Sequence, residues 1–170
     1  MKISSLRAIL HALNHARIKY LIAGGVAVNI HGYQRMTRDL DLVIQLSQDN
    51  ILNAAKALEQ LGYRPNIPVT VEDFANTDKR KEWIETRHMQ VLAMVSEQHP
   101  DTTLDIFITE PFDFDTEYQR ATDVELDQDL TVKIVSIRTL IEMKKQAGRD
   151  RDKDDIQHLA WILEETRKDD

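Results

Sequence analysis

The apolar residues of this chain follow two patterns that alternate along the sequence, helical spacing and short continuous runs. Leu6, Ile9, Leu10 and Leu13 recur at helical spacing behind Ser5, which predicts an opening helix of about three turns with Ser5 as its N-cap. The same spacing predicts helices over residues 26–31, 49–61, 137–147 and 152–166, with Ser136 as the N-cap of the helix over 137–147. Apolar runs predict strands over residues 20–23, 40–46, 89–95, 104–108 and 131–135.

Two stretches have no clear period. Residues 64–86 contain Pro65, Pro68 and the basic cluster Lys79-Arg80-Lys81, so we expect mostly loop there, and residues 111–129 read as an acidic connection. The mixed order of strands and helices predicts an α/β (α+β) fold. We expect one domain over residues 1–170, with a core at about 1–135 and a C-terminal helical pair at about 136–166.

Composition narrows the classes of partner. The chain has 170 residues, of which 42% are apolar, and its 22 Lys and Arg against 29 Asp and Glu give a net charge of −7. A nucleic acid would therefore have to bind through a local basic patch. The absence of cysteine excludes disulfides, thiolate metal sites and cysteine nucleophiles. With a polar N-terminal segment and no long apolar run, we expect a cytoplasmic protein without a membrane span.

Two carboxylates flank the first residue of the predicted strand over residues 40–46. Side chains alternate along a strand, so Asp39 and Asp41 share one face while Leu40 and Leu42 point into the core. Like charges so placed repel each other unless a cation lies between them, and carboxylate oxygens are the ligands Mg²⁺ takes when phosphate supplies the rest. The pair indicates a metal-nucleotide site; the alternative is the solvent face of an edge strand.

Gly24-Gly25 and Asp105 add to this interpretation. The glycines lie between a strand and a helix start, where bare backbone N–H groups can receive a phosphate, or where packing requires a tight turn. Asp105 lies inside the apolar run of residues 104–108, where an ionised carboxylate needs a partner. A metal shared with Asp39 and Asp41 would be one partner, and an arginine would be another.

In this order the features resemble the nucleotidyltransferase superfamily with a polymerase-beta-like core, and more closely the AbiEii-type and related bacterial nucleotidyltransferase-like proteins. The resemblance rests on Gly24-Gly25-Val26-Ala27, on Arg35-Met36-Thr37-Arg38-Asp39-Leu40-Asp41, and on the helical segments over residues 140–149 and 152–159. It covers about residues 20–163. Where the broad superfamily usually has Gly-Ser, this chain has Gly24-Gly25, as the AbiEii-type branch does.

The resemblance implies a mixed-sheet nucleotidyltransferase core whose C-terminal helical pair closes the cleft. It implies Mg²⁺-dependent transfer of a nucleoside monophosphate from an NTP to an acceptor hydroxyl on an RNA end, a protein or a small molecule. Asp39 and Asp41 would hold two Mg²⁺ ions, with Mn²⁺ as an alternative, and Asp105 would bind the ion that activates the acceptor. Gly24 and Gly25 would hold the phosphates.

The same resemblance suggests the toxin-like enzyme of a toxin–antitoxin or phage-defence system, with an antitoxin protein as partner. The alternative is a catalytically silent nucleotide-binding or antitoxin-like module on the same fold. A glycosyltransferase also uses D-x-D on a metal, but such folds usually need a longer chain. A purely structural protein would leave Asp105 unexplained.

Several basic residues are candidates for phosphate binding. Lys144 lies on the buried face of its predicted helix, either in an ion pair with an aspartate of the next helix or, as the resemblance implies, against phosphate with Arg149 nearby. Asp152 or Asp155 would then orient these two side chains. Arg35 and Arg38 either face the triphosphate or are surface charges.

Two weaker signals have simple alternatives. His11 and His15 have metal-ligand spacing but no third ligand in sequence, which favours surface histidines. The basic cluster at residues 79–81, with Trp83 and Arg87, could clamp an RNA end through phosphates and one stacked base, but a solvated loop is the simpler interpretation.

Overall fold

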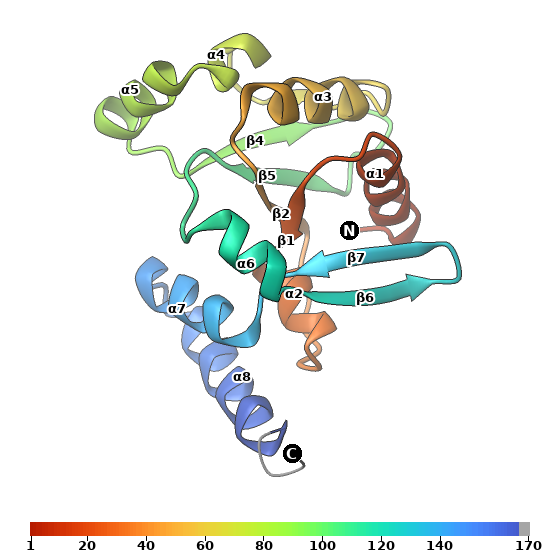
Figure 1. Cartoon of the computed structure of the whole chain (residues 1–170), viewed down its shortest axis with the longest axis vertical. Coiled ribbons are helices and arrows are strands. Elements are labelled where there is room, and N and C mark those ends of the chain that lie inside the picture. Colours follow the sequence, from red (N-terminus) through yellow and green to blue (C-terminus); the bar gives the residue numbers. More distant parts are fainter. Residues whose placement is uncertain (167–170) are drawn as a thin grey trace.

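Strands from the whole length of the chain form one mixed sheet in the computed structural model, which describes residues 1–166 (Figure 1). The strands are β1 (Tyr20–Ile22), β2 (Asp39–Ile44), β3 (Arg64–Pro65), β4 (Val91–Val95), β5 (Thr103–Phe107), β6 (Thr122–Asp127) and β7 (Leu130–Ile134). Their order across the sheet is β3-β4-β5-β2-β1-β7-β6. The last four residues of the predicted domain, 167–170, lie outside the described range.

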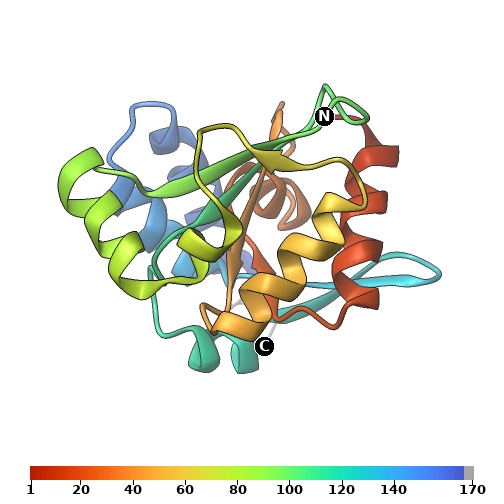
Figure 2. The same cartoon turned by 90° about the horizontal axis from the view of Figure 1, so that it is seen from above.

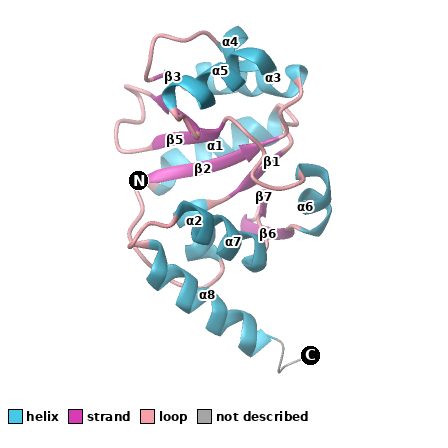
Figure 3. Cartoon of the chain, turned by 90° about the vertical axis from the view of Figure 1, so that its left-hand side faces the viewer, coloured by secondary structure: helices cyan, strands magenta, loops and turns pink. Residues whose placement is uncertain are grey.

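The helices connect and cover these strands. They are α1 (Ile3–His15), α2 (Gly24–Ile30), α3 (Gln48–Glu59), α4 (Val71–Ala75), α5 (Thr77–Arg87), α6 (Phe114–Arg120), α7 (Ile137–Ala147) and α8 (Asp152–Thr166). The C-terminal pair α7 and α8 lies at the opposite end of the molecule from α3, α4 and α5 (Figures 1 and 3). The mixed sheet and the C-terminal helical pair confirm the predicted fold class.

The two faces of the sheet differ in character because side chains alternate along each strand. Leu40 and Leu42 project from β2 into the core and are fully buried, as predicted. On their side α3 and α4 contribute Ile51 and Phe74 to the apolar packing, and α3 crosses this part of the sheet in Figure 2. The other face of β2 carries Asp39 and Asp41.

Pairing between β2 and its neighbours places residues distant in sequence side by side. β2 runs parallel to β5, with Asp41 opposite Asp105, and antiparallel to β1. β4 runs antiparallel to β5, with Val91 opposite Phe107. Asp41, Asp105, Val91 and Phe107 therefore share the face of the sheet that is turned away from α3 and α4.

The predicted loop over residues 64–86 is wrong, because this stretch contains α4 and α5. Local capping supports both helices: Thr70 and Asp73 form a capping box at α4, and the side chain of Asn76 accepts hydrogen bonds at the start of α5. Arg80 is buried against α4, with Nη1 donating to the carbonyl of Phe74 at 2.6 Å. Because polar contacts hold these two helices in place, their sequence shows no strong apolar periodicity.

Two smaller differences concern the start of one helix and one connection. Lys2, not Ser5, is the N-cap of α1, and the buried Ser5 instead contacts Nδ1 of His99 at 2.9 Å. The acidic connection over residues 111–129 contains α6 and β6. None of the helices in residues 1–166 combines the length and hydrophobicity that a membrane crossing needs.

The start of α7 is held by both a predicted and an unpredicted contact. Ser136 is the N-cap, as expected, and accepts from the backbone N–H of Thr139. Glu117 of α6 is also buried there and accepts from the backbone N–H of Ser136 at 2.7 Å and from Oγ1 of Thr139 at 2.8 Å. α6 thereby fixes the beginning of the helix that carries Lys144.

Candidate active site

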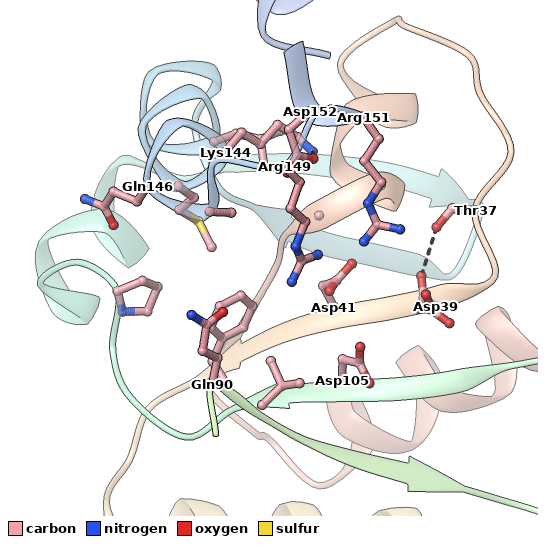
Figure 4. A pocket seen from close by; sticks show the side chains of 18 of the residues that line it. Thr37, Asp39, Asp41, Gln90, Asp105, Lys144, Gln146, Arg149, Arg151 and Asp152 are labelled. Atoms are coloured by element: carbon pink, nitrogen blue, oxygen red, sulfur yellow. Dashed lines mark hydrogen bonds and ion pairs between the residues drawn. The ribbon is translucent and has the colours of Figure 1, made fainter. Parts of the chain in front are cut away.

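A cavity of about 610 Å³ opens on the face of the sheet that carries Asp39, Asp41 and Asp105 (Figure 4). Its other walls are the start of α2, residues 35–38, and α7 with the loop that leads into α8. Sequence segments from five separate parts of the chain thus meet in one concave site, which is the usual form of a small-molecule binding site.

The structure brings the three predicted aspartates onto one wall of this cavity. Asp41 and Asp105 are directly paired neighbours on parallel strands, and Asp39 precedes Asp41 by two residues on the same face. Directly paired residues on one face have closely spaced Cβ atoms. Three carboxyl groups are therefore crowded on one face of the sheet.

Burial and mutual repulsion raise the pKa of two of these carboxyl groups. The pKa of Asp41 is raised by burial first and by the charge of Asp39 second, and is lowered in part by a backbone hydrogen bond from Gly25 and by nearby Lys144 and Arg149. Burial, then the charges of Asp41 and Asp39, raises the pKa of Asp105 to about 6.

The donor chemistry of this wall fits a divalent cation. Carboxylate oxygens are the ligands that Mg²⁺ and Mn²⁺ prefer, and a cation would relieve the repulsion that raises the pKa values. Within the described part of the chain, no three His, Cys, Asp or Glu side chains are already arranged as a metal-binding group. The aspartates therefore supply charge and ligand type, but not a preformed three-carboxylate centre.

Gly24 and Gly25 lie against the acidic wall rather than in open space. At Gly24, which has a φ of +58°, an added Cβ would lie 1.8 Å from Oδ2 of Asp41. At Gly25 it would lie 2.7 Å from Oγ1 of Thr37. The glycine pair makes room for the Asp41 carboxylate and for the segment that leads into β2.

Several arginines line the cavity, and two of them face the aspartates from the opposite wall. Arg38, Arg149 and Arg151 line the cavity, and the last two extend from the α7–α8 loop toward Asp41 and Asp39 (Figure 4). Arg151 was missed by sequence analysis. The sequence feature that could have indicated Arg151 is the alternation of basic and acidic residues over 149–153. Which of these charged side chains faces the cavity depends on the path of the loop after Gly148.

Lys144 and Arg35 also line the cavity, and both belong to a charge network that is mostly buried. Nζ of Lys144 lies 3.1 Å from Oδ1 of Asp152 and 2.6 Å from Oδ2 of Asp155. Arg35 holds the same Asp155 from the other side, with Nε 2.7 Å from Oδ1 and Nη2 2.9 Å from Oδ2. Of the two interpretations of Lys144, the structure shows the ion pair, and a phosphate contact stays a prediction.

Other sequence candidates lie outside the cavity. The basic cluster at residues 79–81 is part of α5, so the favoured interpretation as a solvated loop is wrong. Trp83 is only 2% exposed, which also rules out the alternative of an RNA base stacked on this side chain. His11 lies beside Asp129, with 3.8 Å between Nε2 and Oδ1. Among residues 1–166, His11 and His15 belong to no group of three metal-ligand side chains.

Comparison with known protein families gives one match that covers most of the chain. The family model described as nucleotidyl transferase AbiEii toxin, type IV TA system, matches residues 7–160. No curated protein matches the chain.

Solved structures with similar folds include nucleotidyltransferases of several kinds. The lincosamide antibiotic adenylyltransferase LnuA, bound to lincomycin, superposes with a TM-score of 0.64 at 16% identity, over 95% of this chain and 98% of that one. ANT(2")-Ia in complex with adenylyl-2"-tobramycin gives 0.59 at 14% identity, over 94% and 88%. A Thermotoga maritima protein assigned as a nucleotidyltransferase gives 0.55 at 11% identity, over 95% and 92%. At these identities the similarity shows a shared fold.

Proposed function

The chain belongs to the AbiEii nucleotidyl transferase toxin family, and we propose that it transfers a nucleoside monophosphate from an NTP to an acceptor hydroxyl with the help of Mg²⁺. A bond forms between the acceptor oxygen and the α-phosphorus, and the bond from the α-phosphorus to the oxygen that bridges to the β-phosphorus breaks. Pyrophosphate leaves, and the proton of the acceptor hydroxyl passes to a carboxylate of the site.

The three aspartates have distinct places in this proposal. Asp39 and Asp41 on β2 would hold the divalent ions, and Asp105 on β5 would bind the ion on the acceptor side and help to remove the acceptor proton. When bound, divalent ions neutralise the carboxylates and stabilise the charge that develops on the transferred phosphate. The buried Leu40 and Leu42 anchor β2 so that both carboxyl groups keep their direction.

The basic wall would hold the triphosphate. Arg38, Arg149 and Arg151 line the cavity, and the last two face the aspartates from the α7–α8 loop, so these side chains can neutralise phosphates that the acidic wall alone would repel. Gly24 and Gly25 would let the phosphates approach the backbone at the start of α2. Lys144 supports this wall by holding Asp152 and Asp155 at the start of α8.

One observation carries the proposal: in a chain of a nucleotidyltransferase family, Asp41 and Asp105 are paired side by side in a cavity whose opposite wall holds arginines. The family's type IV toxin–antitoxin assignment supports an NTP as substrate and an antitoxin as the regulating partner. The acceptor can be an RNA end, a protein side chain or a small molecule, and the experiment below separates these classes.

The test is label transfer from each of the four NTPs. We expect wild-type protein with Mg²⁺ and cell extract to transfer label to one fraction among RNA, protein and small molecules, and Asp41→Asn and Asp105→Asn to lose the transfer. Asp49→Asn, an exposed aspartate of α3, is the matched control and should be fully active. Wild-type protein that binds NTP but labels no fraction would overturn the proposal and support the silent binding module.

A further inference from the structure

The acidic wall continues into an apolar one along the same strands. Phe107 follows Asp105 by two residues on β5, so it shares the face of the aspartates at about 7 Å along the strand. Val91 on β4 is paired with Phe107 and shares that face. Both side chains are half-buried and line the cavity.

α7 closes this end of the cavity from the other side. Leu140 and Met143 line the cavity within the turn that precedes Lys144, so the helix presents apolar side chains opposite Phe107. The exposed side chains of Gln90 and Gln146 lie at the same end, away from Thr37 and Asp39 (Figure 4). The cavity therefore has a charged end and an apolar end with two amides at its rim.

We propose that the apolar end holds the nucleobase of the donor NTP, packed against Phe107 and Met143, with the amides of Gln90 and Gln146 selecting the base. This inference rests on the proposed function, because it assigns the remaining part of the same substrate. An NTP joins a triphosphate to a planar heteroaromatic ring, which matches the two ends of the cavity in order. Aromatic and thioether side chains pack well against such a ring.

The two glutamines supply the polar part of the recognition. Each amide carries both a donor and an acceptor, so it can pair with the hydrogen-bonding edge of a base that the apolar walls hold in place. A wrong base leaves those groups unpaired, which weakens its binding relative to the right one. Gln90 and Gln146 are therefore specificity residues, whereas Phe107 contributes to the affinity for every NTP.

The experiment compares NTPs with inorganic tripolyphosphate, which has the charge but no base. Dissociation constants are measured with Mg²⁺ for the full chain and for Phe107→Ala, Phe107→Leu, Gln90→Ala and Gln146→Ala, with circular dichroism to check folding. Phe107→Ala should weaken the preferred NTP about tenfold, equal to about 1.4 kcal/mol, and leave tripolyphosphate unchanged. Phe107→Leu, which keeps the apolar volume, should give a smaller loss.

The glutamine variants test selection rather than affinity. Gln90→Ala and Gln146→Ala should reduce the difference in affinity between the preferred NTP and the other three, and Gln60→Ala, an exposed glutamine that does not line the cavity, should leave it unchanged. The nucleobase site is wrong, while the proposed function stands, if the Phe107 variants bind NTP and tripolyphosphate with equally reduced affinity. The same holds if the variants bind both ligands as tightly as the wild-type protein does. Base-dependent binding without label transfer would overturn the proposed transfer and support the nucleobase site; no NTP binding at all would overturn both.

Discussion

The backbone of Gly24 lies directly against the carboxylate of Asp41, so that a Cβ at position 24 would be 1.8 Å from Oδ2 and 2.8 Å from the Cβ of Asp41. The contact is with the part of Asp41 nearest its own backbone as well as with its tip, so a rotation of the carboxyl group alone cannot relieve it. Gly24 therefore sets where the Asp41 carboxylate can lie.

Gly24→Ala should displace Asp41 and remove nucleotidyl transfer. Gly32→Ala is the matched control, because Gly32 has a φ of +116° at the other end of α2 and its Cβ would meet only Ile162 at 3.8 Å. Each variant should lose about 1–2 kcal/mol of stability from its positive φ. Denaturant unfolding and label transfer measure both effects. Equal residual activity in the two folded variants would contradict the role of Gly24.

Removing one carboxylate should stabilise the protein when metal is absent. In EDTA, Asp41→Asn is expected to be neutral or stabilising by roughly 0.5–2 kcal/mol, against the usual destabilising trend, because it ends the repulsion with Asp39 and Asp105. Asn keeps an oxygen for the backbone hydrogen bond from Gly25. In wild type, Mg²⁺ at about ten times its Kd should add about 1.4 kcal/mol, and the variant should lose most of this gain.

Melting curves with EDTA and with Mg²⁺ measure these two effects, with Asp49→Asn as the control. If Asp41→Asn melts well below wild type in EDTA and still responds equally to Mg²⁺, Asp41 is structural and the metal-site assignment is wrong.

The contribution of Asp105 to the stability of the metal-free protein should fall as the pH rises toward neutrality. Because the pKa of Asp105 is about 6 in the folded chain, against 3.8 for an ordinary Asp, the folded state binds more protons between these values. The contribution of Asp105 to the free energy of unfolding is present below about pH 4 and is lost as the pH rises through about 6. We expect Asp105→Asn to remove about 1–2 kcal/mol from the change in the free energy of unfolding with pH. A pKa difference of one corresponds to about 1.4 kcal/mol, and solvent screens part of the interaction. Unfolding in urea at pH 5 and 7.5 measures this change; an identical slope in the variant would contradict the assignment.

Lys144→Met should destabilise the fold more than it weakens NTP binding. The substitution leaves Asp152 without its ammonium partner and Asp155 with Arg35 alone, and breaking a buried pair in this way costs about 3–5 kcal/mol. Lys145→Met, which removes an exposed pair with Glu142, should cost less than about 1 kcal/mol. A tenfold weaker NTP affinity at an unchanged melting temperature would instead place Lys144 on phosphate.

Arg151→Ala should weaken NTP and tripolyphosphate alike, by about tenfold each, or about 1.4 kcal/mol. The side chain extends toward the acidic wall and has no role at the apolar end of the cavity. Arg138→Ala, an exposed arginine of α7 outside the cavity, should leave both affinities unchanged. Titrations at two salt concentrations measure the effect, and a loss confined to NTP would show that Arg151 contacts the sugar or base.

Local patterns were enough to predict most elements and the aspartates. The alternation of Asp39 and Asp41 with Leu40 and Leu42 is a property of one strand, and the structure confirms the shared face. The pairing of Asp41 with Asp105 is not local, because the register of two strands 64 residues apart depends on the whole sheet.

The features that the sequence did not predict escaped prediction for different physical reasons. The helices α4 and α5 rest on the side-chain caps of Thr70 and Asn76 and on the buried Arg80, which a search for apolar spacing passes over. The position of α8 relative to α7 decides whether Lys144 forms an ion pair or contacts phosphate, and this position cannot be derived from local sequence. Prediction of the apolar end of the cavity requires both the register between β4 and β5 and the knowledge of which face of α7 lies over the sheet.

The two walls of the cavity come from opposite parts of the chain, with consequences for its synthesis. β2 and β5, which carry the aspartates, are synthesised before the α7–α8 loop that carries Arg149 and Arg151. A domain generally folds as one unit, so the site forms only when all of these segments are present. A nascent chain that ends before Arg149 would carry the acid groups with no arginines from the α7–α8 loop to face them, so it would repel nucleotides. The growing polypeptide therefore has no complete nucleotide-binding wall until the segment that carries Arg149 and Arg151 has been synthesised.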